Sequence, residues 1–554
     1  LMDDLILRAD TVSLTTPYFQ KPILGSLVDK SKNLLESGQG SPKFSSFSQR
    51  LSIVELRENM DFDGGFTLEG SRVVGEGVKG NPARLIFKYE GKPTLSVSSL
   101  NFSIDPSRIL ARESSLKLSY PNGDSLTHGS GLFEYDDNIK TLNFTATKLG
   151  NKAIKFLDYH FNVALSAPVL QWEVGSPFPK FTFEVATSQA QKVMGVESLN
   201  YYDEALNKTW GVGSQNAITQ LANYCRKNNL VKLSEGQAAT ALNLSVDYSK
   251  TKLLDLSMEG FLIYNSSEKT IIPSAKLFSF ADANASLIDF DNISFQCDLR
   301  ERNNPAVPPN DPIAKAESNR IAILNNRFTK QDFYAFIDLA KDQVFLTGVD
   351  QIVISKTQRA AIFLDSSYCI LKPNRDLIFN GELVAGKLRA IVNNAYFSYS
   401  DFKFKINHAK YAALVVNPMS VQDGNDPIEL VSSYANMSGE ILIDESTSKS
   451  GKSSTNKNYP KLLVPNPTKI VYSDPSIVNG SYDSSRFYFL LEPFELDSLD
   501  NFTELSQRFK GKLISGGIFP PIAEPLKIMP DYSLGFSTMA PAGGWPFYGE
   551  NSTY

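Results

Sequence analysis

The chain has 554 residues, of which 42% are apolar and 21% charged, so it is long enough for several hydrophobic cores and is not a disordered polypeptide. Its formal net charge is −5, which argues against nucleic acid or an anionic membrane as the main partner. The chain is rich in Phe and Tyr, 36 and 23 residues, and both favour half-buried positions in sheets. Composition therefore predicts a mostly β protein.

Residues 1–200 have the pattern of antiparallel strands. Apolar and polar residues alternate through Leu85, Phe87 and Tyr89, and turn-forming residues at 91–93 and 121–124 separate such runs. Alternation of period two between turns is typical of strands with one buried face. We therefore predict an N-terminal β region over 1–200.

Residues 201–280 interrupt this pattern with helical periodicity. Asn216, Ser234 and Ser245 each precede an apolar stripe and can cap a helix, and Gly260 can end the third helix. The segment 261–272 then places two short apolar runs around a polar turn, as in a hairpin. Three helices followed by a hairpin predict an inserted winged-helix-like module. Three ordinary helices between two β regions are the alternative.

The charge of this module disfavours DNA, the usual ligand of a winged helix. DNA binding is driven largely by neutralisation of phosphates, and the module has a net charge of only +1. We therefore expect no nucleic-acid ligand and predict that the module contacts protein. The charged residues between 216 and 272 are Arg226, Lys227, Lys232, Lys250, Lys252 and Lys269 against Glu235, Asp247, Asp255, Glu259 and Glu268.

Residues 281–554 return to strand patterns and form the predicted C-terminal β region. The proline-rich stretch 305–312 predicts a linker, 330–341 a short helix, and the Ser/Lys/Asn-rich stretch 445–460 an exposed loop. The runs 361–364 and 488–491 are apolar at every position, which is typical of strands covered on both faces. Because the chain opens on Leu1 and stops at Tyr554 within turn material, we expect a fragment of a larger protein, truncated at Tyr554.

A weak repeat links the β regions. The sequence FNGELVAG at 379–386 is echoed by FKGKLISG at 509–516; 68–75 keeps the spacing of five between glycines, and 437–441 keeps the first half. A glycine inside a strand marks a bend or a close approach of backbones, so we expect Gly381 and Gly511 to occupy equivalent strand bends. Recurrence of one bent strand predicts antiparallel or solenoid-like stacked sheets. Chance similarity among strands that contain glycine is the alternative.

Residues with catalytic or metal-binding chemistry are sparse and scattered. Cys225, Cys297 and Cys369 form neither a disulfide framework nor a metal motif, so we expect them to be buried. His128 should lie at a strand–turn junction and have a hydrogen-bonded structural role. The GKS at 451–453 resembles the end of a phosphate-binding loop but lacks its first glycine and the helix that should follow. We predict no catalytic, cofactor-binding or metal-binding residues, no cofactor and no membrane span.

Seven phrases along the chain carry a resemblance: GGFTLEG at 64–70, NPARLIF at 81–87, DSLTH at 124–128, KPNRD at 372–376, RFYF at 486–489, DSLDNF at 497–502 and PDYSLGF at 530–536. They resemble very large, uncharacterised cell-envelope proteins of Bacteroidota bacteria. The resemblance implies an internal fragment of an exported, mostly β protein of the cell envelope, in the periplasm or at the cell surface. It implies no activity and no catalytic residue. Gly129 stands where the relatives have a proline, so we expect the local turn to differ.

These observations predict a non-enzymatic structural or assembly scaffold of the cell envelope that binds other envelope proteins. One alternative is a β-groove conduit that carries lipid or another amphiphile across the periplasm, which would require an open sheet with a continuous apolar face. A second alternative is a carbohydrate-binding or carbohydrate-active protein that uses exposed aromatic residues such as Trp172 and Trp545.

Overall fold

The structure is a computed structural model with mostly antiparallel β architecture. Strands account for 51% of it and helices for 13%, so the predicted fold class is confirmed at this level. The residues that the structure describes are 5–16, 22–35, 40–46, 50–70, 72–149, 152–184, 192–211, 213–265, 268–300, 332–419, 427–452, 458–472, 478–500, 507–546 and 548–549. The predicted linker at 305–312 lies outside them.

The chain forms two compact units that do not follow the three regions suggested by the sequence. The first unit contains Leu1–Ile288 and Gln296–Thr347, and the second contains Asp289–Phe295 and Gly348–Tyr554. The chain passes from one unit to the other three times, after Ile288, within β23 (Ser294–Asp298) and after Thr347. The predicted regions 1–200, 201–280 and 281–554 describe the order along the chain, whereas the units describe which segments pack together.

The predicted helix at 330–341 is wrong. Residues 330 and 331 lie outside the described part of the chain, and the rest form strand β24 (Phe333–Asp338) and a turn. β24 pairs on one side with β18 (Lys180–Thr182) and on the other with β25 (Gln343–Thr347). Pairing on both sides outweighs a weak local preference for helix. The pairing with β18 also explains why Gln296–Thr347 belongs to the first unit.

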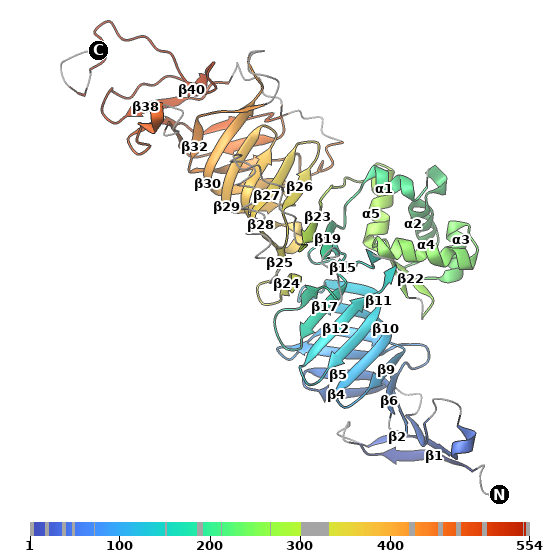
Figure 1. The fold of residues 1–554 in the computed structure, drawn as a ribbon. Helices are drawn as coiled ribbons and strands as arrows, with labels where there is room; N and C mark the ends of the chain where they lie inside the picture. The colour runs from blue at the N-terminus through green and yellow to red at the C-terminus, as the bar shows by residue number, and fades with distance from the viewer. Residues whose placement is uncertain are drawn as a thin grey trace, which may run out of the picture. The chain divides into compact units, whose positions relative to one another are not determined.

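The first unit has two layers that share three long bent strands, β5 (Met60–Glu69), β10 (Arg108–Ser119) and β11 (Ser125–Asp136) (Figure 1). One layer has the order β3 (Lys43–Ser46), β5, β6 (Arg72–Glu76), β9 (Asn101–Ile104), β10, β11, β12 (Thr141–Ala146), β17 (Val169–Glu173), β18, β24 and β25. The other has the order β4 (Leu51–Arg57), β5, β7 (Ala83–Tyr89), β8 (Lys92–Ser99), β10, β11, β15 (Phe156–Asp158), β16 (Val163–Leu165) and β19 (Val193–Ser198). The first layer continues outward from β3 through β2 (Ile23–Lys30) and β1 (Ile6–Leu14).

The two layers of the first unit face each other across an aromatic core. The ring centres of Phe87 and Phe133 lie 6.0 Å apart, although several strands separate them within the sheet. Phe156 of one layer and Phe181 of the other lie 5.4 Å apart. All four side chains are fully buried, so rings from both layers fill the space between the layers.

A helical module is inserted between β19 and β23 (green in Figure 1). Asn216, Ser234 and Ser245 cap three helices as predicted, and Ser234 completes a capping box with Gln237. The order helix, helix, helix, hairpin agrees with the prediction, while the winged-helix fold itself stays a prediction. The elements are α1 (Glu204–Thr209), α2 (Ala217–Lys227), β20 (Leu233–Ser234), α3 (Glu235–Leu242), α4 (Val246–Met258), β21 (Leu262–Asn265), β22 (Thr270–Pro273) and α5 (Ala275–Asn284).

The second unit repeats the layered plan. Its central strands are β26 (Gln351–Ser355), β27 (Ala360–Leu371), β28 (Leu377–Ala385), β29 (Leu388–Ser398) and β30 (Lys403–Val416). From β30 the sheet divides into β33 (Met437–Leu442), β34 (Lys461–Val464) and β37 (Phe494–Leu496), and into β32 (Ser433–Ala435), β35 (Thr468–Val471), β36 (Phe487–Leu491) and β38 (Gly511–Ser515). Tyr434 and Phe494 stack 5.8 Å apart between these branches. Short pairs elsewhere are β13 (Lys148–Leu149) with β14 (Lys152–Ala153), β31 (Ile428–Glu429) with β30, and β39 (Lys527–Ile528) with β40 (Leu534–Gly535).

The two fully apolar runs are not covered on both faces, which corrects the prediction. In β27, Ile362 and Leu364 are buried, but the intervening Phe363 is 37% exposed. In the run at 488–491, Phe489 and Leu491 are buried, and Tyr488 and Leu490 on the other face are half-buried. An antiparallel sheet packs one face on the core and leaves the other near solvent, whatever residues stand there.

Candidate functional site

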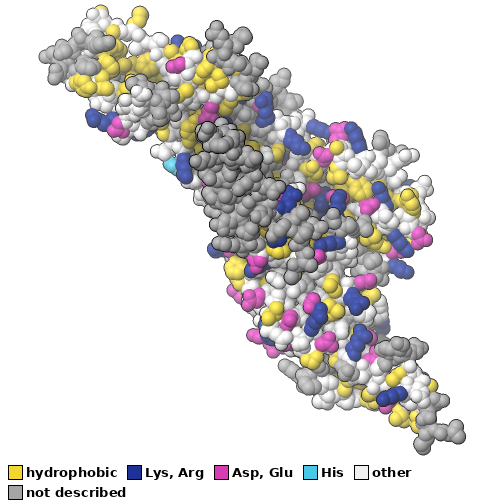
Figure 2. All heavy atoms as spheres, in the orientation of Figure 1, with side chains coloured by type: hydrophobic (Ala, Val, Ile, Leu, Met, Phe, Trp, Pro, Cys, Tyr) yellow, Lys and Arg dark blue, Asp and Glu magenta, His cyan; other side chains and the backbone are white. Residues whose placement is uncertain are grey.

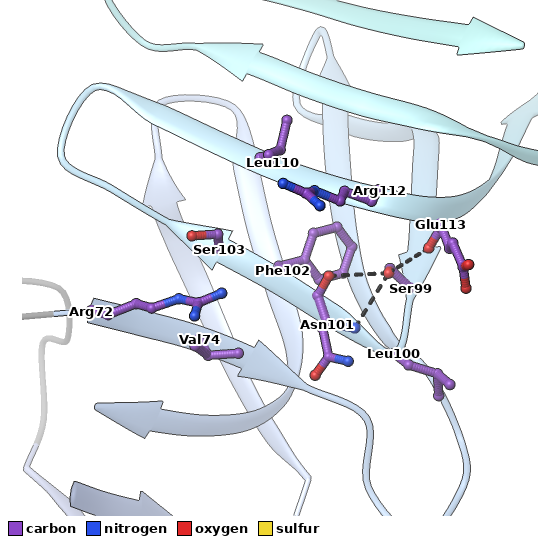
Figure 3. Close-up of a pocket in the computed structure, with 10 residues that line it drawn as sticks. All are labelled: Arg72, Val74, Ser99, Leu100, Asn101, Phe102, Ser103, Leu110, Arg112 and Glu113. Carbon is purple, nitrogen blue, oxygen red and sulfur yellow. Dashed lines mark hydrogen bonds between the residues drawn. The ribbon is translucent and has the colours of Figure 1, made fainter. Parts of the chain in front are cut away.

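A pocket of about 650 Å³ lies on the first unit where β6, β9 and β10 meet (Figure 3). It forms where the chain changes layer: β8 ends at Ser99 in one layer, and β9 begins at Asn101 in the other. β10 pairs with β8 through its second half and with β9 through its first half, so its middle residues face this crossover. The Ser99 hydroxyl donates a hydrogen bond to the Glu113 carbonyl oxygen at 2.6 Å and thereby satisfies a backbone acceptor at the bend.

Side chains of three adjacent strands line the floor of this pocket. Val74, Ser103 and Leu110 form a row, because Ser103 pairs with Val74 on one side and with Leu110 on the other. β6 and β10 are both antiparallel to β9 and therefore run parallel to each other. Arg72 precedes Val74 by two residues and Arg112 follows Leu110 by two, so the arginines stand at diagonally opposite corners. Figure 3 shows their side chains extending towards each other from these corners.

The pocket has an excess of positive charge. Arg72 and Arg112 are exposed and have no ion-pair partner in the described part of the chain, while Glu113 is the acidic residue among the lining residues that the structure describes. Ser103 and Asn101 add a hydroxyl and an amide. Several basic residues elsewhere in these layers pair with carboxylates, in Arg50–Asp63, Arg57–Asp137, Lys88–Asp61 and Arg108–Glu134.

A second pocket of about 650 Å³ lies among the turns at one end of the same layers. His160 lines it and stacks on Tyr120, with ring centres 4.5 Å apart. One ring nitrogen of His160, Nε2, lies 2.6 Å from Asp342, and the other, Nδ1, lies 3.0 Å from the amide nitrogen of Asn122. Because both ring nitrogens are engaged, His160 fastens three turns together and does not have the open nitrogen that a general base needs.

Beneath this histidine lies a buried carboxyl group. Asp158 accepts a hydrogen bond from the Tyr120 hydroxyl at 2.6 Å and further bonds from the backbone nitrogens of His160 and Phe161. Burial raises the pKa of Asp158 to about 6, although these hydrogen bonds act in the opposite direction. Burial likewise raises the pKa of the Tyr120 hydroxyl well above its usual value. We interpret the cluster as a structural clamp for the turns.

His128 has the structural role predicted for it, but it lies inside β11 and not at a strand–turn junction. Its ring packs between Phe144 and Phe156, and its Nε2 lies 3.1 Å from the Ile154 carbonyl oxygen. Burial lowers the pKa of His128 to about 4, so the side chain is neutral at physiological pH. The three cysteines are free and buried, as predicted.

A buried ionic network joins the helical module to the β layers. Lys276 of α5 is fully buried and pairs with Glu197 of β19, while Lys155 lies 3.2 Å from Glu197 and 2.9 Å from Glu259 at the end of α4. Burial lowers the pKa of Lys276 to about 8. Burial opposes ionisation of Glu259 too, but Lys155 and Lys152 outweigh it and lower the pKa of Glu259 to about 2. Two carboxylates and two buried lysines thus compensate each other at the junction.

The hairpin of the module packs into a notch in β11. The notch lies at Gly129, where an added Cβ would lie 2.2 Å from Cγ2 of Ile263. Ile263 also packs on the buried Leu157, Ala164 and Leu199. The wing-like hairpin is therefore used for packing within the protein. Gly129 lies within a strand, so the turn expected there is not present.

The outward side of the module has mixed charge and several exposed apolar residues. Figure 2 shows basic and acidic side chains interspersed over its visible face. Val231, Leu244, Val246 and Tyr248 are exposed, Val231 by 85% and Tyr248 by 73%. Such a surface is suited to protein contacts, whereas a nucleic-acid interface would gather basic residues.

Within the described ranges, no group of three or more His, Cys, Asp or Glu residues is placed to hold a metal ion. None of the helices in those ranges is long and apolar enough to cross a membrane. The fold and sites define an antiparallel β protein with a docked helical module and an arginine-lined pocket. Comparisons of the chain with protein-family models, curated proteins and solved structures found no match.

Sequence reasoning did not identify the residues of either pocket. Arg72 and Arg112 lie 40 positions apart on strands that are not neighbours, and His160 meets Asp342 across 182 positions. No motif spacing connects such residues, because strand pairing alone brings them together. The available signal was weak: arginine at an outward position of a predicted strand.

Proposed function

We propose that the chain is a non-enzymatic structural or assembly scaffold of the bacterial cell envelope, with the helical module as its protein-contacting part. The observation that carries the proposal is the filled interior of both units. Phe87 contacts Phe133 across the layers of the first unit, and Tyr434 contacts Phe494 in the second. Layers that bury each other's side chains are stable structural elements and leave the outer faces for partners.

The filled interior favours a scaffold over the alternative conduit for lipid. A conduit needs a continuous apolar face that lipid covers, and here aromatic rings of the opposing layer occupy that place. The envelope location belongs to the proposal and is supported by the resemblance to Bacteroidota envelope proteins. The module supports the same function, since buried charges anchor it while Val246 and Tyr248 stay exposed.

The carbohydrate-binding alternative has less support. Trp172, one of the two aromatic residues considered for it, is fully buried in β17, and its indole nitrogen donates to the Ser176 carbonyl oxygen at 2.9 Å. A buried ring cannot stack on a sugar. Trp545 is half-buried.

Lipid analysis of the protein purified from its host tests the proposal. We expect native mass spectrometry and solvent extraction to find no stoichiometric phospholipid above the level in a mock purification. Stoichiometric phospholipid held by the interior would reject the scaffold and support the conduit. In the same preparation, crosslinked envelope proteins should map to peptides of the module; crosslinks confined to other surfaces would contradict its assigned role.

A further inference from the structure

The arginine pocket combines groups that nothing in the scaffold function requires. Two exposed guanidinium groups face one concavity without a carboxylate partner among the described residues. Two positive charges on one concavity raise the local positive potential, which attracts an anion. The charge excess therefore indicates a ligand with negative charge.

The geometry narrows the chemistry of that ligand. Arg72 and Arg112 approach from opposite corners, so an anion between them can accept hydrogen bonds from both sides (Figure 3). Guanidinium forks match the oxygens of phosphate, and the Ser103 hydroxyl and Asn101 amide provide further donors. Val74 and Leu110 are half-buried and offer an apolar strip beside these donors. A phosphate joined to a carbon skeleton can bind the donors through its oxygens and contact the apolar strip through its carbon atoms.

We propose that this pocket binds a phosphate ester, with the phosphate between Arg72 and Arg112 and the esterified carbon skeleton over Val74 and Leu110. The phosphate ester can be a small soluble molecule or the head group of a phospholipid at a membrane surface. Both present the same oxygens to the arginines. Because the pocket is open to water, the binding weakens as salt is added.

Titration of the full chain with glycerol 3-phosphate tests the proposal. Calorimetry in low salt should show saturable binding, and free glycerol should not bind. Arg72→Ala and Arg112→Ala should each weaken binding by about tenfold, since each removes a charge-assisted contact. Arg84→Ala is the matched control, because Arg84 is also exposed, lies in the same unit and has no ion-pair partner in the described part of the chain. The control should bind like the parent.

Vesicles distinguish the two sources of the ligand. Cosedimentation with phosphatidylglycerol vesicles that is lost in both pocket variants identifies a lipid head group; binding of glycerol 3-phosphate alone identifies a soluble ester. Absence of saturable binding to both, or equal weakening in the Arg84→Ala control, overturns the proposal. Circular dichroism verifies that each variant is folded, and Arg72→Lys, which keeps the charge but loses the fork, should show intermediate affinity. Phospholipid that still co-purifies with an Arg72→Ala/Arg112→Ala double variant would instead indicate an interior lipid site and reject the scaffold function.

Discussion

The two units build the same kind of layered sheet but bend their long strands by different means. In the first unit, β10 bends at a register shift, where the Ser99 hydroxyl donates a hydrogen bond to the Glu113 carbonyl oxygen. In the second, β28 bends at Gly381, whose φ is +142° and where the pairing with β29 shifts register. An added Cβ at Gly381 would lie 2.1 Å from the Phe363 carbonyl oxygen. A polar side chain supports one bend, and the lack of a side chain permits the other.

The units also differ in how they hold segments outside their sheets. In the first unit, the network of Lys276, Glu197, Lys155 and Glu259 anchors a whole helical module. In the second, Asp289 accepts hydrogen bonds from the backbone of the loop at 445–452. The first unit therefore holds its helical module through buried charges, whereas the second holds this loop through backbone hydrogen bonds to a carboxylate. A single substitution can therefore destabilise one unit and leave the other unchanged.

The largest effect is expected from Gly381→Val. The valine would adopt a φ that L-residues avoid and would clash with backbone in the middle of the sheet, between β27 and β29. We expect a loss of about 4 kcal/mol of unfolding free energy in the second unit. Hydrogen exchange measured by mass spectrometry should show lost protection in β27 to β30, with the first unit unchanged. Gly543→Val, at an exposed position with no atom within 4 Å of the added Cβ, is the control. Protection like the parent's would contradict the assigned strain.

Glu197→Gln should have the next largest effect, on the first unit. Removing this charge leaves Lys276 fully buried beside Lys155 without its carboxylate partner. We expect a loss of about 3 kcal/mol at neutral pH and earlier hydrogen exchange in α5 and β19. Lys152→Gln is the control, because Lys152 is 75% exposed and its pair with Glu259 contributes little. If both variants unfold alike, the network has no role in docking.

Much of the fold was readable from local signals, and the rest was not because it depends on distant pairing. The caps Asn216, Ser234 and Ser245 were found, since a capping side chain and the stripe after it lie within one short window. Helix α5 was missed although Ser274 caps it. β24 was taken for a helix because its partner β18 lies about 150 residues earlier, and no local pattern reveals that pairing.

The candidate sites were less predictable than the fold. His128 was predicted to be structural because a lone histidine beside Asp and Ser is more often a hydrogen-bonded structural residue than a catalyst. The arginine pocket depends on the change of layer between β8 and β9, and the sequence shows only a Ser and an Asn at that point. Crossing from one layer to the other is a property of the whole sheet, so the pocket could be found only in three dimensions.

The buried His128 should make the stability of the first unit depend on pH. The folded pKa of His128 is lowered from 6.5 to about 4, so the unfolded state binds more protons between these values and stability falls as pH decreases through them. We expect His128 alone to remove about 2–3 kcal/mol by pH 4. Asp158, whose folded pKa is raised to about 6, contributes in the opposite direction as pH falls below 6 and offsets part of this loss. Glu259, with a folded pKa of about 2, adds a further loss below pH 4.5. His128→Gln, which keeps a donor and an acceptor without the titration, should remove the loss due to His128, so the first unit of the variant should gain stability relative to the parent between pH 7 and 4. An unchanged slope in urea unfolding would reject this role.

The smallest effect is expected from Gly511→Val. The sequence repeat predicts that Gly381 and Gly511 occupy equivalent strand bends, and this variant tests whether a side chain costs the same at both positions. Both glycines approach backbone closely, because an added Cβ at Gly511 would lie 2.3 Å from the Leu490 carbonyl oxygen. Gly511 has an ordinary φ, however, and it begins β38, which pairs along its length with β36 and meets Ile522 on the other side through an isolated bridge. A strand with one full partner can shift away from a new side chain, whereas β28 is held on both sides. We therefore expect a loss of about 1–2 kcal/mol, well below that of Gly381→Val. Equal losses for the two variants would show that contact, and not backbone conformation, sets the cost at Gly381.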